Sequence, residues 1–313
     1  MISVVIPCYK VKDLILQVIS KIGTEVQRIY VIDDCCPEHT GKFVEENCQD
    51  SRVSVLYNKA NKGVGGAVIT GYKQAISDGA EIIVKLDGDG QMNPVLIPKL
   101  VKSLLNGTAD YCKGNRFFQM ESLSRMPKIR LFGNSILSLI NKMVNGYWNI
   151  VDPTNGFTAI HHKALKLLPL DKIDNHYFFE SDMLFRLSTI RAVIKDVAMD
   201  SVYNDEKSNL KISRVIFEFP FKYFNRFIKR IFYNYLLRDF NSGSVQLFLG
   251  CLLFLFGLIF GLYHWFMSYK SFALASSGTV MLAALPLILG FQLLLGALNF
   301  DVQNIPQIPI QDE

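Results

Sequence analysis

A pair of carboxylates one residue apart is the sharpest chemical feature of the chain. Asp87 and Asp89 follow the apolar stretch Glu81 to Leu86, each is followed by a glycine, and Gln91 comes next. Two carboxylates at this spacing in a turn can converge on a hard cation, and Mg²⁺ or Mn²⁺ is commonly held by one or two carboxylates plus substrate phosphates. A calcium loop is disfavoured because the twelfth position counted from Asp87 is Pro98 rather than Glu. The segment therefore predicts a divalent-metal site for a phosphate-bearing ligand.

Two acidic residues at another predicted strand end could bind a nucleoside. Asp33 and Asp34 follow the stretch Arg28 to Ile32. Carboxylates at that place in nucleotide-binding sheets accept hydrogen bonds from a ribose or a base. The alternative is that Asp34 caps the next helix.

A glycine-rich turn precedes the helix expected from Val64 to Ser77. It contains Asn61, Lys62 and Gly63, with further small residues in the first helical turn. Such a helix N-terminus suits either a phosphate or close backbone packing. The turn is neither a Walker loop nor a G-x-G-x-x-G fingerprint.

Glu180 and Asp182 are candidates for a general base, which a transfer reaction requires when its acceptor is a hydroxyl group. The alternative is an acidic first turn of a helix, which the helix dipole stabilises.

These residues need a scaffold that brings strand ends together. Apolar runs that predict strands alternate with stretches of helical periodicity. The expected strands are 2–7, 28–32, 53–57, 81–86 and 110–113, and the expected helices are 11–22, 64–77, 93–107 and 129–145. This alternation predicts an α/β fold with a mostly parallel sheet, helices on both faces and ligands at the carboxyl ends of the strands. Residues 151–200 show no clear period, and we expect them to be irregular.

The C-terminal part carries almost no charge. Residues 240–300 contain one charged side chain, Lys270. The runs 245–267 and 271–300 are each long enough to cross a hydrocarbon layer of about 30 Å. The hinge 268–270 is too short for a domain, so the pattern predicts a hairpin, and the basic residues before it place both of its ends in the cytoplasm. Buried core helices are the alternative.

The segment 215–240 interleaves bulky apolar residues with Lys and Arg. This pattern suits a helix in the membrane interface, and an amphipathic helix packed on the soluble domain is the alternative. We therefore expect a catalytic domain at 1–210, a juxtamembrane amphipathic segment at 211–243, a transmembrane hairpin at 244–300 and a cytoplasmic tail at 301–313. The tail, which has two prolines, suggests an arm for self-association into a homo-oligomer.

Composition agrees with this division. The net charge is +5, and the basic residues gather beside the apolar part, which favours an anionic membrane surface over nucleic acid. The six cysteines form no C-x-x-C pair, so we expect free thiols in a reducing cytosol. The N-terminus lacks a basic region and a small-residue cleavage site, so we expect no secretory signal.

The motifs occur in an order that resembles the nucleotide-sugar domain of family 2 glycosyltransferases. Four motifs carry this resemblance: Val4 to Tyr9, Asp33-Asp34, Asn61 to Gly65 and Asp87 to Gln91. Three later ones are similar to the polyprenyl-phosphate branch, which includes dolichyl-phosphate mannose synthase: Gly114 to Phe117, Arg130, and Asp152 to Phe157. The resemblance covers about residues 1 to 200, and a C-terminal pair of membrane spans also occurs in that branch. It implies a GT-A fold and an inverting transfer.

The resemblance also implies roles for individual residues. Asp87, Asp89 and Gln91 would hold Mg²⁺ or Mn²⁺ on the donor diphosphate, and Asp33 or Asp34 would contact the nucleoside of a UDP- or GDP-linked sugar. Further donor contacts would come from Pro7, Tyr9, Asn61, Lys62 and Gly63.

Other matched residues would contact phosphate or sugar. Arg116 and Arg130 would bind phosphate, and Asp152 would lie near the sugar. The chain departs from the branch at Asn134, where Ser is frequent, and after residue 200, where an Arg followed by G-x-S-K is frequent. Lys207 or Lys211 would then supply the contacts to the acceptor phosphate.

The implied enzyme is a multi-pass protein of the inner, cytoplasmic membrane that acts in cell-envelope polysaccharide synthesis. It would transfer a sugar to polyprenyl phosphate, such as undecaprenyl phosphate, an anionic acceptor that needs no strong base. The alternative acceptor is a hydroxyl of another lipid or lipid-linked glycan, with Glu180 or Asp182 as the base. The sequence leaves the sugar and the base of the donor open.

Overall fold

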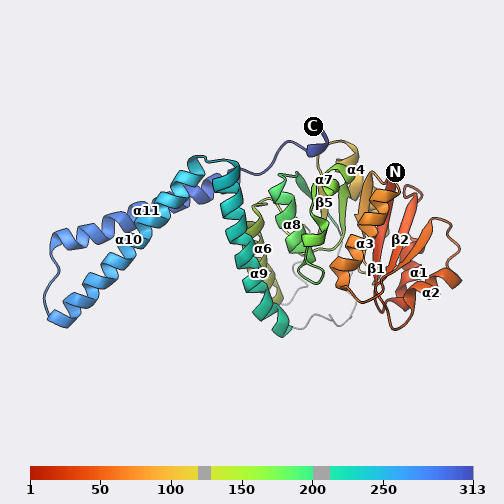
Figure 1. The fold of residues 1–313 in the computed structure, drawn as a ribbon, viewed down its shortest axis with the longest axis horizontal. Helices are drawn as coiled ribbons and strands as arrows, with labels where there is room; N and C mark the ends of the chain where they lie inside the picture. The colour runs from red at the N-terminus through yellow and green to blue at the C-terminus, as the bar shows by residue number, and fades with distance from the viewer. Residues whose placement is uncertain (119–127, 200–211, 313) are drawn as a thin grey trace. The chain divides into compact units, whose positions relative to one another are not determined.

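The computed structural model describes residues 1–118, 128–199 and 212–312 (Figure 1). The chain divides into two compact units. The first unit comprises Met1–Phe227 and Pro306–Glu313, and the second unit comprises Ile228–Ile305. Lys207 and Lys211, the expected acceptor-phosphate contacts, lie outside the described residues.

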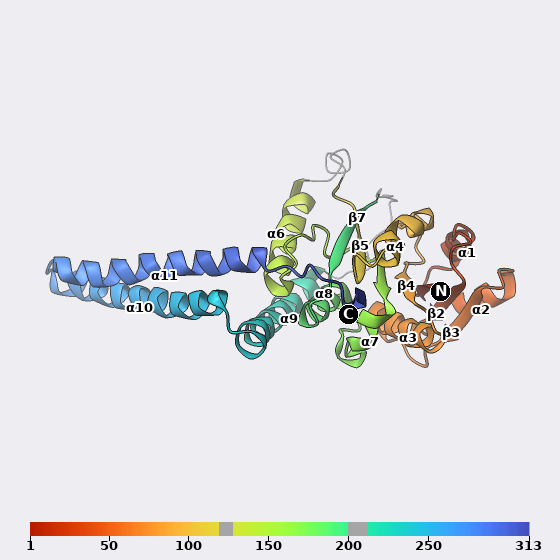
Figure 2. The same ribbon diagram turned by 90° about the horizontal axis from the view of Figure 1, so that it is seen from above.

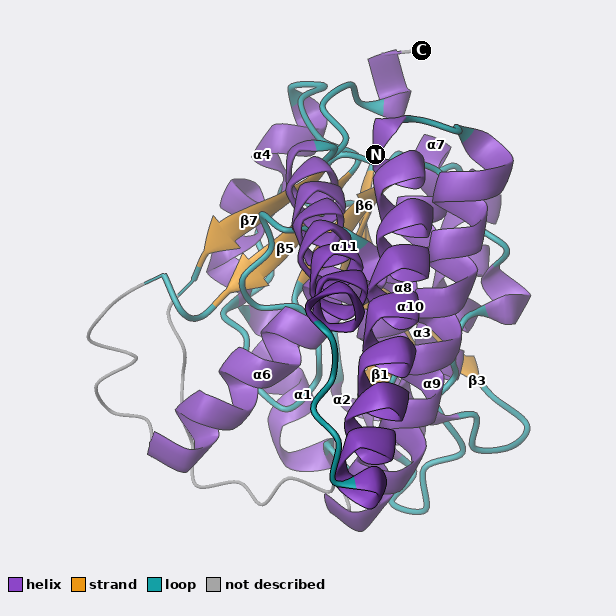
Figure 3. Ribbon diagram, turned by 90° about the vertical axis from the view of Figure 1, so that its left-hand side faces the viewer, coloured by secondary structure: helices purple, strands orange, loops and turns teal. Residues whose placement is uncertain are grey.

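A seven-stranded sheet forms the centre of the first unit. Its order is β3-β2-β1-β4-β6-β5-β7, and several of its strands can be followed in Figures 1 and 3. The strands are β1 (Ile2–Cys8), β2 (Arg28–Asp33), β3 (Val53–Tyr57), β4 (Ile82–Lys85), β5 (Tyr111–Asn115), β6 (Thr158–His161) and β7 (Ile194–Ala198). β6 runs antiparallel to β4 and β5, while the other neighbouring pairs are parallel. The expected α/β sheet is confirmed, with one antiparallel strand that the sequence did not predict.

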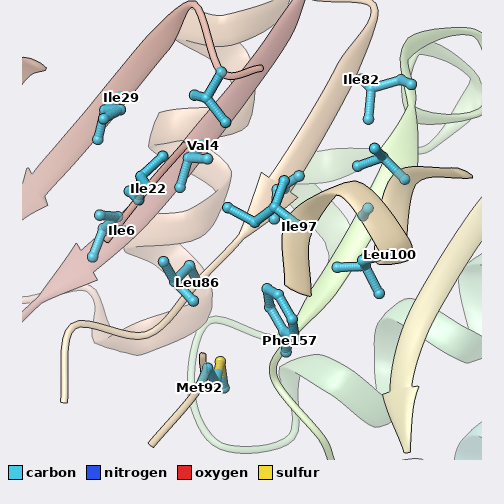
Figure 4. Packing of buried hydrophobic residues seen from close by; sticks show 14 of the residues in the cluster. Val4, Ile6, Ile22, Ile29, Ile82, Leu86, Met92, Ile97, Leu100 and Phe157 are labelled. Carbon is cyan, nitrogen blue, oxygen red and sulfur yellow. The ribbon is translucent and has the colours of Figure 1, made fainter. Parts of the chain in front are cut away.

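Helices cover both faces of this sheet. The helices that begin in this unit are α1 (Lys12–Ser20), α2 (Thr40–Asn47), α3 (Gly63–Ser77), α4 (Ile97–Leu105), α6 (Lys128–Asn145), α7 (His162–Leu167), α8 (Phe179–Thr189) and α9 (Ile212–Phe232). Side chains alternate along a strand, so Val4 and Ile6 of β1 join the apolar cluster built with α1 and α4 (Figure 4). Val5 points to the other face, where a Cβ on Gly71 of α3 would lie 2.3 Å from its Cγ1. Close helix packing therefore requires glycine at position 71.

The expectation that residues 151–200 are irregular is wrong. This region contains β6, α7, α8 and β7. β6 and β7 have four and five residues, which is too short for a clear period. The missed strands complete the half of the sheet that lies beyond β4.

Helix α9 has two different faces. Tyr223 packs with Phe178 in a buried cluster, and the two rings meet edge to face at 4.9 Å. On the other face, the side chains of Phe221 and Phe224 are 72% and 63% exposed. The buried face agrees with packing on the soluble domain, and the exposed face keeps the composition of an interfacial helix.

Two long apolar helices make up most of the second unit. α10 (Ser242–Ser271) and α11 (Ser277–Gln303) run side by side (Figures 1 and 2) and are long and apolar enough to cross a membrane. The turn between them lies at 272–276 rather than at the expected 268–270, because α10 continues through Lys270. The side chain of Ser276 caps α11 by accepting the backbone N–H of Thr279 at 3.2 Å.

Small residues let the two helices approach closely. A Cβ on Gly290 would lie 2.4 Å from the backbone nitrogen of Phe254, and one on Gly257 would lie 2.7 Å from that of Leu287. Backbone atoms cannot rotate away as a flexible side chain can. Small residues at the contact between apolar helices are typical of helix pairs in membranes.

We expect Gly290→Ala to destabilise the hairpin and Gly261→Ala to leave it intact. A methyl group at 290 must push the backbone of Phe254 away, whereas one at 261 meets only the methyl group of Ala283 at 3.4 Å. Both changes add the same atoms to a helix interior. Thermal unfolding in detergent should show a lower melting temperature for Gly290→Ala alone, and equal melting temperatures would contradict the packing.

The C-terminal segment returns to the first unit. The buried carboxylate of Asp110 accepts the backbone N–H groups of Ile310 at 3.1 Å and of Gln311 at 3.3 Å, together with that of Val193 at 2.8 Å. Lys163 donates to the carbonyl of Gln311 at 2.9 Å. The tail thus binds its own chain, and its role as an arm for self-association stays a prediction.

Candidate active site

The carboxyl ends of β1, β2 and β4 meet at one edge of the sheet. Cys8, the last residue of β1, is in register with Asp33 of β2, and β4 pairs with the other side of β1. Because the three strands are parallel neighbours, the residues that follow them, Tyr9, Asp34 and Asp87, lie at the same edge. The strand ends therefore bring together three of the four motifs of the expected donor site, those that contain Tyr9, Asp34 and Asp87.

Lys85 links two acidic residues of this edge. Its ammonium group donates to Asp87 Oδ1 at 2.8 Å and to the carbonyl of Gly156 at 3.2 Å, and lies 3.1 Å from Glu180 Oε1. The side chain is fully buried. Burial lowers the pKa of Lys85, but the carboxylates of Asp87 and Glu180 outweigh it, and the pKa stands above its ordinary value. A permanent cation therefore holds Asp87 and Glu180 in place.

The loop that contains Gly156 packs directly on this centre. A Cβ at position 156 would lie 2.5 Å from Lys85 Nζ and 2.7 Å from Asp87 Oδ2. Only glycine leaves room for both groups. Leu86, Met92 and Phe157, which adjoin the site residues in the sequence, belong to the buried apolar cluster (Figure 4). The site is thus built on a rigid core.

Asp87 and Asp89 are the carboxylates expected to hold a divalent cation. Asp89 Oδ1 accepts the backbone N–H of Gln91 at 3.0 Å in a turn where Gly90 has a positive φ of 76°. The side chain of Asp87 is 28% exposed. Within the described ranges, no cluster of three or more His, Cys, Asp or Glu side chains could hold a metal. Two carboxylates alone suit Mg²⁺ or Mn²⁺ when substrate phosphates supply further oxygen ligands.

Arg116 is held by Asp152 through two parallel hydrogen bonds. Its Nε donates to Oδ2 at 2.8 Å and its Nη2 donates to Oδ1 at 3.0 Å. Asp152 is fully buried, while 27% of the Arg116 side chain is exposed. Bidentate pairs of this kind fix the guanidinium plane. The structure thus brings these two predicted residues together as a pre-oriented cation and its anchor.

Asp33 and Asp34 use their carboxylates within the chain. Asp33 accepts the backbone N–H groups of Cys36 and Gly41, both at 2.7 Å. Asp34 accepts the N–H groups of Lys62 at 3.0 Å and of Gly63 at 2.8 Å, at the start of α3. Asp34 therefore satisfies amides at the start of α3, and Asp33 satisfies one amide in the first turn of α2 and one in the loop before it.

The start of α3 is closely packed rather than open. A Cβ on Gly63 would lie 2.3 Å from His176 Nδ1, and the Gly66 N–H donates to the carbonyl of Asn175 at 3.1 Å. The small residues of this turn thus allow close packing, one of the two alternatives that the sequence left open. Asn61 Oδ1 accepts the Gly63 N–H at 3.1 Å. Lys62 lines a cavity of about 600 Å³ beside the end of β3.

Glu180 and Asp182 have different surroundings. Glu180 contacts Lys85 and is 13% exposed. Asp182 is fully buried and accepts two hydrogen bonds from Arg226 of α9, at 2.6 and 3.1 Å, and one from the backbone of Asp174 at 2.9 Å. These contacts favour a structural role for Asp182 and leave Glu180 as the one of the two beside Asp87.

The remaining predicted residues are Pro7, Tyr9, Gln91 and Arg130. Pro7 belongs to β1, and Tyr9 follows it with 44% of its surface exposed. Gln91 is exposed beside the Asp89 turn. Arg130 lies in the first turn of α6, of which only the backbone is described.

Two buried lysines, Lys85 and Lys113, were missed by reasoning from the sequence. Lys85 ends β4 and Lys113 is the middle residue of β5, and both are fully buried. A lysine in a buried strand is rare unless it is paired. That rarity is the signal that could have found them.

This geometry defines a class of protein. A doubly covered sheet that carries a carboxylate pair after β4 is the GT-A arrangement of nucleotide-sugar-dependent glycosyltransferases. The chain belongs to glycosyl transferase family 2, whose family model matches residues 3–168. The protein is therefore a glycosyltransferase.

Curated relatives narrow the branch. The chain is 29% identical to the UDP-N-acetylglucosamine–dolichyl-phosphate N-acetylglucosaminyltransferase of Methanococcus voltae, over 66% of this chain and 87% of the relative. It is 30% identical to the undecaprenyl-phosphate mannosyltransferase of Micrococcus luteus, over 56% of this chain and 71% of the relative. The homologues are thus sugar transferases named for polyprenyl-phosphate acceptors. Together with the two apolar helices, they indicate a membrane protein.

Solved structures agree on the fold. Glucosyl-3-phosphoglycerate synthase from Mycobacterium tuberculosis, in complex with uridine diphosphate, gives a TM-score of 0.54 at 19% identity, covering 74% of this chain and 79% of that one. A complex of the same enzyme with Mn²⁺, UDP-glucose and phosphoglyceric acid gives 0.54 at 18%, with the same coverage. At these identities the likeness establishes the GT-A fold.

Proposed function

We propose that the protein transfers a sugar from a UDP- or GDP-linked donor to a polyprenyl phosphate, such as undecaprenyl phosphate, with inversion at the anomeric carbon. The observation that carries this proposal is the union, in one chain, of the Asp87–Asp89 site and a hairpin long enough to span a membrane. A water-soluble donor and a lipid acceptor can meet only at a membrane surface. Relatives named for polyprenyl-phosphate acceptors support the same acceptor class.

Asp87, Asp89 and Gln91 would hold Mg²⁺ or Mn²⁺ against the donor diphosphate. The cation would neutralise charge on the leaving group. Arg116, fixed by Asp152, presents a further positive charge that needs no reorganisation during the reaction, and Arg130 is proposed for a second phosphate contact. Residues at the strand ends and in the turn before α3 would surround the nucleoside: Pro7, Tyr9, Asp33, Asp34, Asn61, Lys62 and Gly63.

The chain path supports a location for the reaction. It leaves the first unit at Phe227 and re-enters that unit at Pro306. Both ends of the hairpin connect to one unit, so we propose that both lie on the same side of the membrane. The basic residues before α10 favour the cytoplasmic side of the inner membrane.

Sugar transfer can be tested with the full-length chain in detergent. We expect one labelled donor from a panel of UDP- and GDP-sugars to label the organic phase when undecaprenyl phosphate and Mg²⁺ or Mn²⁺ are present. Chelation of the metal should stop the transfer, and NMR of the product should show the inverted anomer. If no donor labels the added lipid, the proposed acceptor is wrong.

A second candidate acceptor is a hydroxyl of another lipid or lipid-linked glycan. The contact of Glu180 with Lys85, which also holds Asp87, favours this candidate because it puts a carboxylate beside the donor site. Glu180 would then act as the base. A labelled lipid-linked glycan, with polyprenyl phosphate left unlabelled, would support this alternative.

A further inference from the structure

Three residues form a row across the neighbouring strands β4, β6 and β5. Thr158 of β6 is paired with Lys85 of β4 on one side and with Lys113 of β5 on the other. Directly paired residues of neighbouring strands point to the same face of a sheet. Two fully buried lysines therefore lie on either side of Thr158, on one face.

The two ammonium groups bind successive carbonyls of one loop. Lys85 donates to the carbonyl of Gly156, and Lys113 donates to that of Asn155. The loop is further shaped by the Asn155 side chain, which accepts the N–H of Phe157 at 2.9 Å. Two cations from different strands thus fix neighbouring peptide groups of the same loop.

This loop, residues 152–157, carries or contacts the groups assigned to the donor diphosphate. Asp152 at its start holds Arg116 through two hydrogen bonds. Near the end of the loop, a Cβ at position 156 would clash with the Asp87 carboxylate, so this position holds a glycine. A shift of the loop would therefore move the Arg116 guanidinium and the Asp87 carboxylate relative to each other.

Lys113 loses its proton more easily than Lys85. It is surrounded by Glu180 of α8, Asp152 of the loop, Lys85 of β4 and Asp196 of β7. Burial lowers the pKa of Lys113 to about 8, and the nearby carboxylates oppose this effect only in part. The charged form is thus present below about pH 8 and is lost as the pH rises through this value.

We propose that Lys85 and Lys113 form a buried clamp that positions loop 152–157 for binding of the donor diphosphate. Lys113 acts through Asn155 and does not touch the donor, so it is a positioning residue. The clamp rests on the proposed donor site and not on the identity of the acceptor. Loss of the Lys113 charge should loosen the loop and weaken the grip of Arg116 and Asp87 on the diphosphate.

The test compares the wild type with Lys113→Met, Lys113→Arg and the control Lys166→Met, whose lysine is exposed on α7. Calorimetry measures binding of UDP and GDP with Mg²⁺ between pH 6.5 and 9.5, and donor consumption gives kcat/KM over the same range. The calorimetric readout needs no acceptor, whereas kcat/KM requires one. If polyprenyl phosphate proves not to be the acceptor, the clamp can still be judged.

We expect wild-type diphosphate affinity and kcat/KM to fall as the pH rises through about 8. Lys113→Met should lower kcat/KM at pH 7 on the order of 10²-fold, the scale of a misplaced catalytic group, and should lack the fall. Lys113→Arg keeps its charge, so its diphosphate affinity and kcat/KM should fall only at a higher pH. Lys166→Met should match the wild type.

Two results would overturn the clamp. One is a folded Lys113→Met protein, judged by its thermal melt, with wild-type kcat/KM and the same pH profile. The other is a wild-type protein whose diphosphate affinity does not change between pH 7 and pH 9. The second result needs no variant, so the proposal stays testable even if the substituted chains do not fold.

Discussion

Asp89→Asn should lower sugar transfer on the order of 10³-fold, the scale of losing a central electrostatic group. The amide has no negative charge for a divalent cation, but its oxygen can still accept the Gln91 N–H that the carboxylate accepts at 3.0 Å. The turn should therefore keep its shape. Initial rates of donor consumption measure the effect. The free energy of unfolding, measured by thermal unfolding, should change by no more than about 0.5 kcal/mol.

Asp171→Asn is the matched control for this prediction. Asp171 pairs with Lys73 at the surface, and its side chain is 85% exposed. Exposed ion pairs contribute little, so this variant should retain full activity. Near-normal transfer by Asp89→Asn would remove Asp89 from the proposed metal site.

Asp182→Asn should destabilise the fold by about 3 kcal/mol, because it breaks a buried ion pair and leaves the Arg226 guanidinium without its counter-charge. The carboxylate is fully buried and accepts two hydrogen bonds from Arg226. Denaturant unfolding in detergent measures the loss. The fraction that remains folded should turn over at a rate near that of the wild type.

Glu180→Gln provides the contrast. Glu180 contacts Lys85 rather than α9, so its loss should affect the site more than the attachment of α9. If Asp182→Asn instead kept full stability and abolished turnover with donor binding intact, Asp182 would be a catalytic base. The same outcome for Glu180→Gln would favour a hydroxyl acceptor.

The parallel half of the fold could be predicted from the sequence because its strands are continuous apolar runs. Val4 and Ile6, for example, lie in a strand that is buried on both faces. Its apolar sequence alone predicts a strand, without any knowledge of the neighbouring strands. The polar residues that end such strands, Asp33, Asp34 and Asp87, were then placed at one edge by topology alone. The two membrane-length helices could be predicted in the same way, from the length of their apolar runs and the near absence of charged residues.

The roles of the acidic residues could not be predicted, because they depend on contacts far along the chain. Asp34 meets the start of α3, and the loop at Asn175 and His176 closes over that same start. Asp182 is engaged by Arg226, which is 44 residues away. No local pattern distinguishes a carboxylate that binds substrate from one that binds the backbone.

Buried lysines are hidden for a related reason. Lys85 is adjacent in space to Glu180 and Gly156, which the sequence separates widely. Periodicity describes which face of an element is apolar, and it cannot show which buried cation will find partners. The partners of Lys85 lie on α8 and in the loop before β6, which only the folded chain brings beside it.

The most direct measurement compares two acceptors that differ only in their phosphate. The full-length protein, its active donor and Mg²⁺ or Mn²⁺ are incubated with a polyprenyl phosphate or with the matching polyprenol. The lipid products are then identified by mass spectrometry. We expect a polyprenyl monophosphate sugar from the first acceptor and no product from the second. A glycosylated polyprenol with no monophosphate sugar would contradict the proposed function.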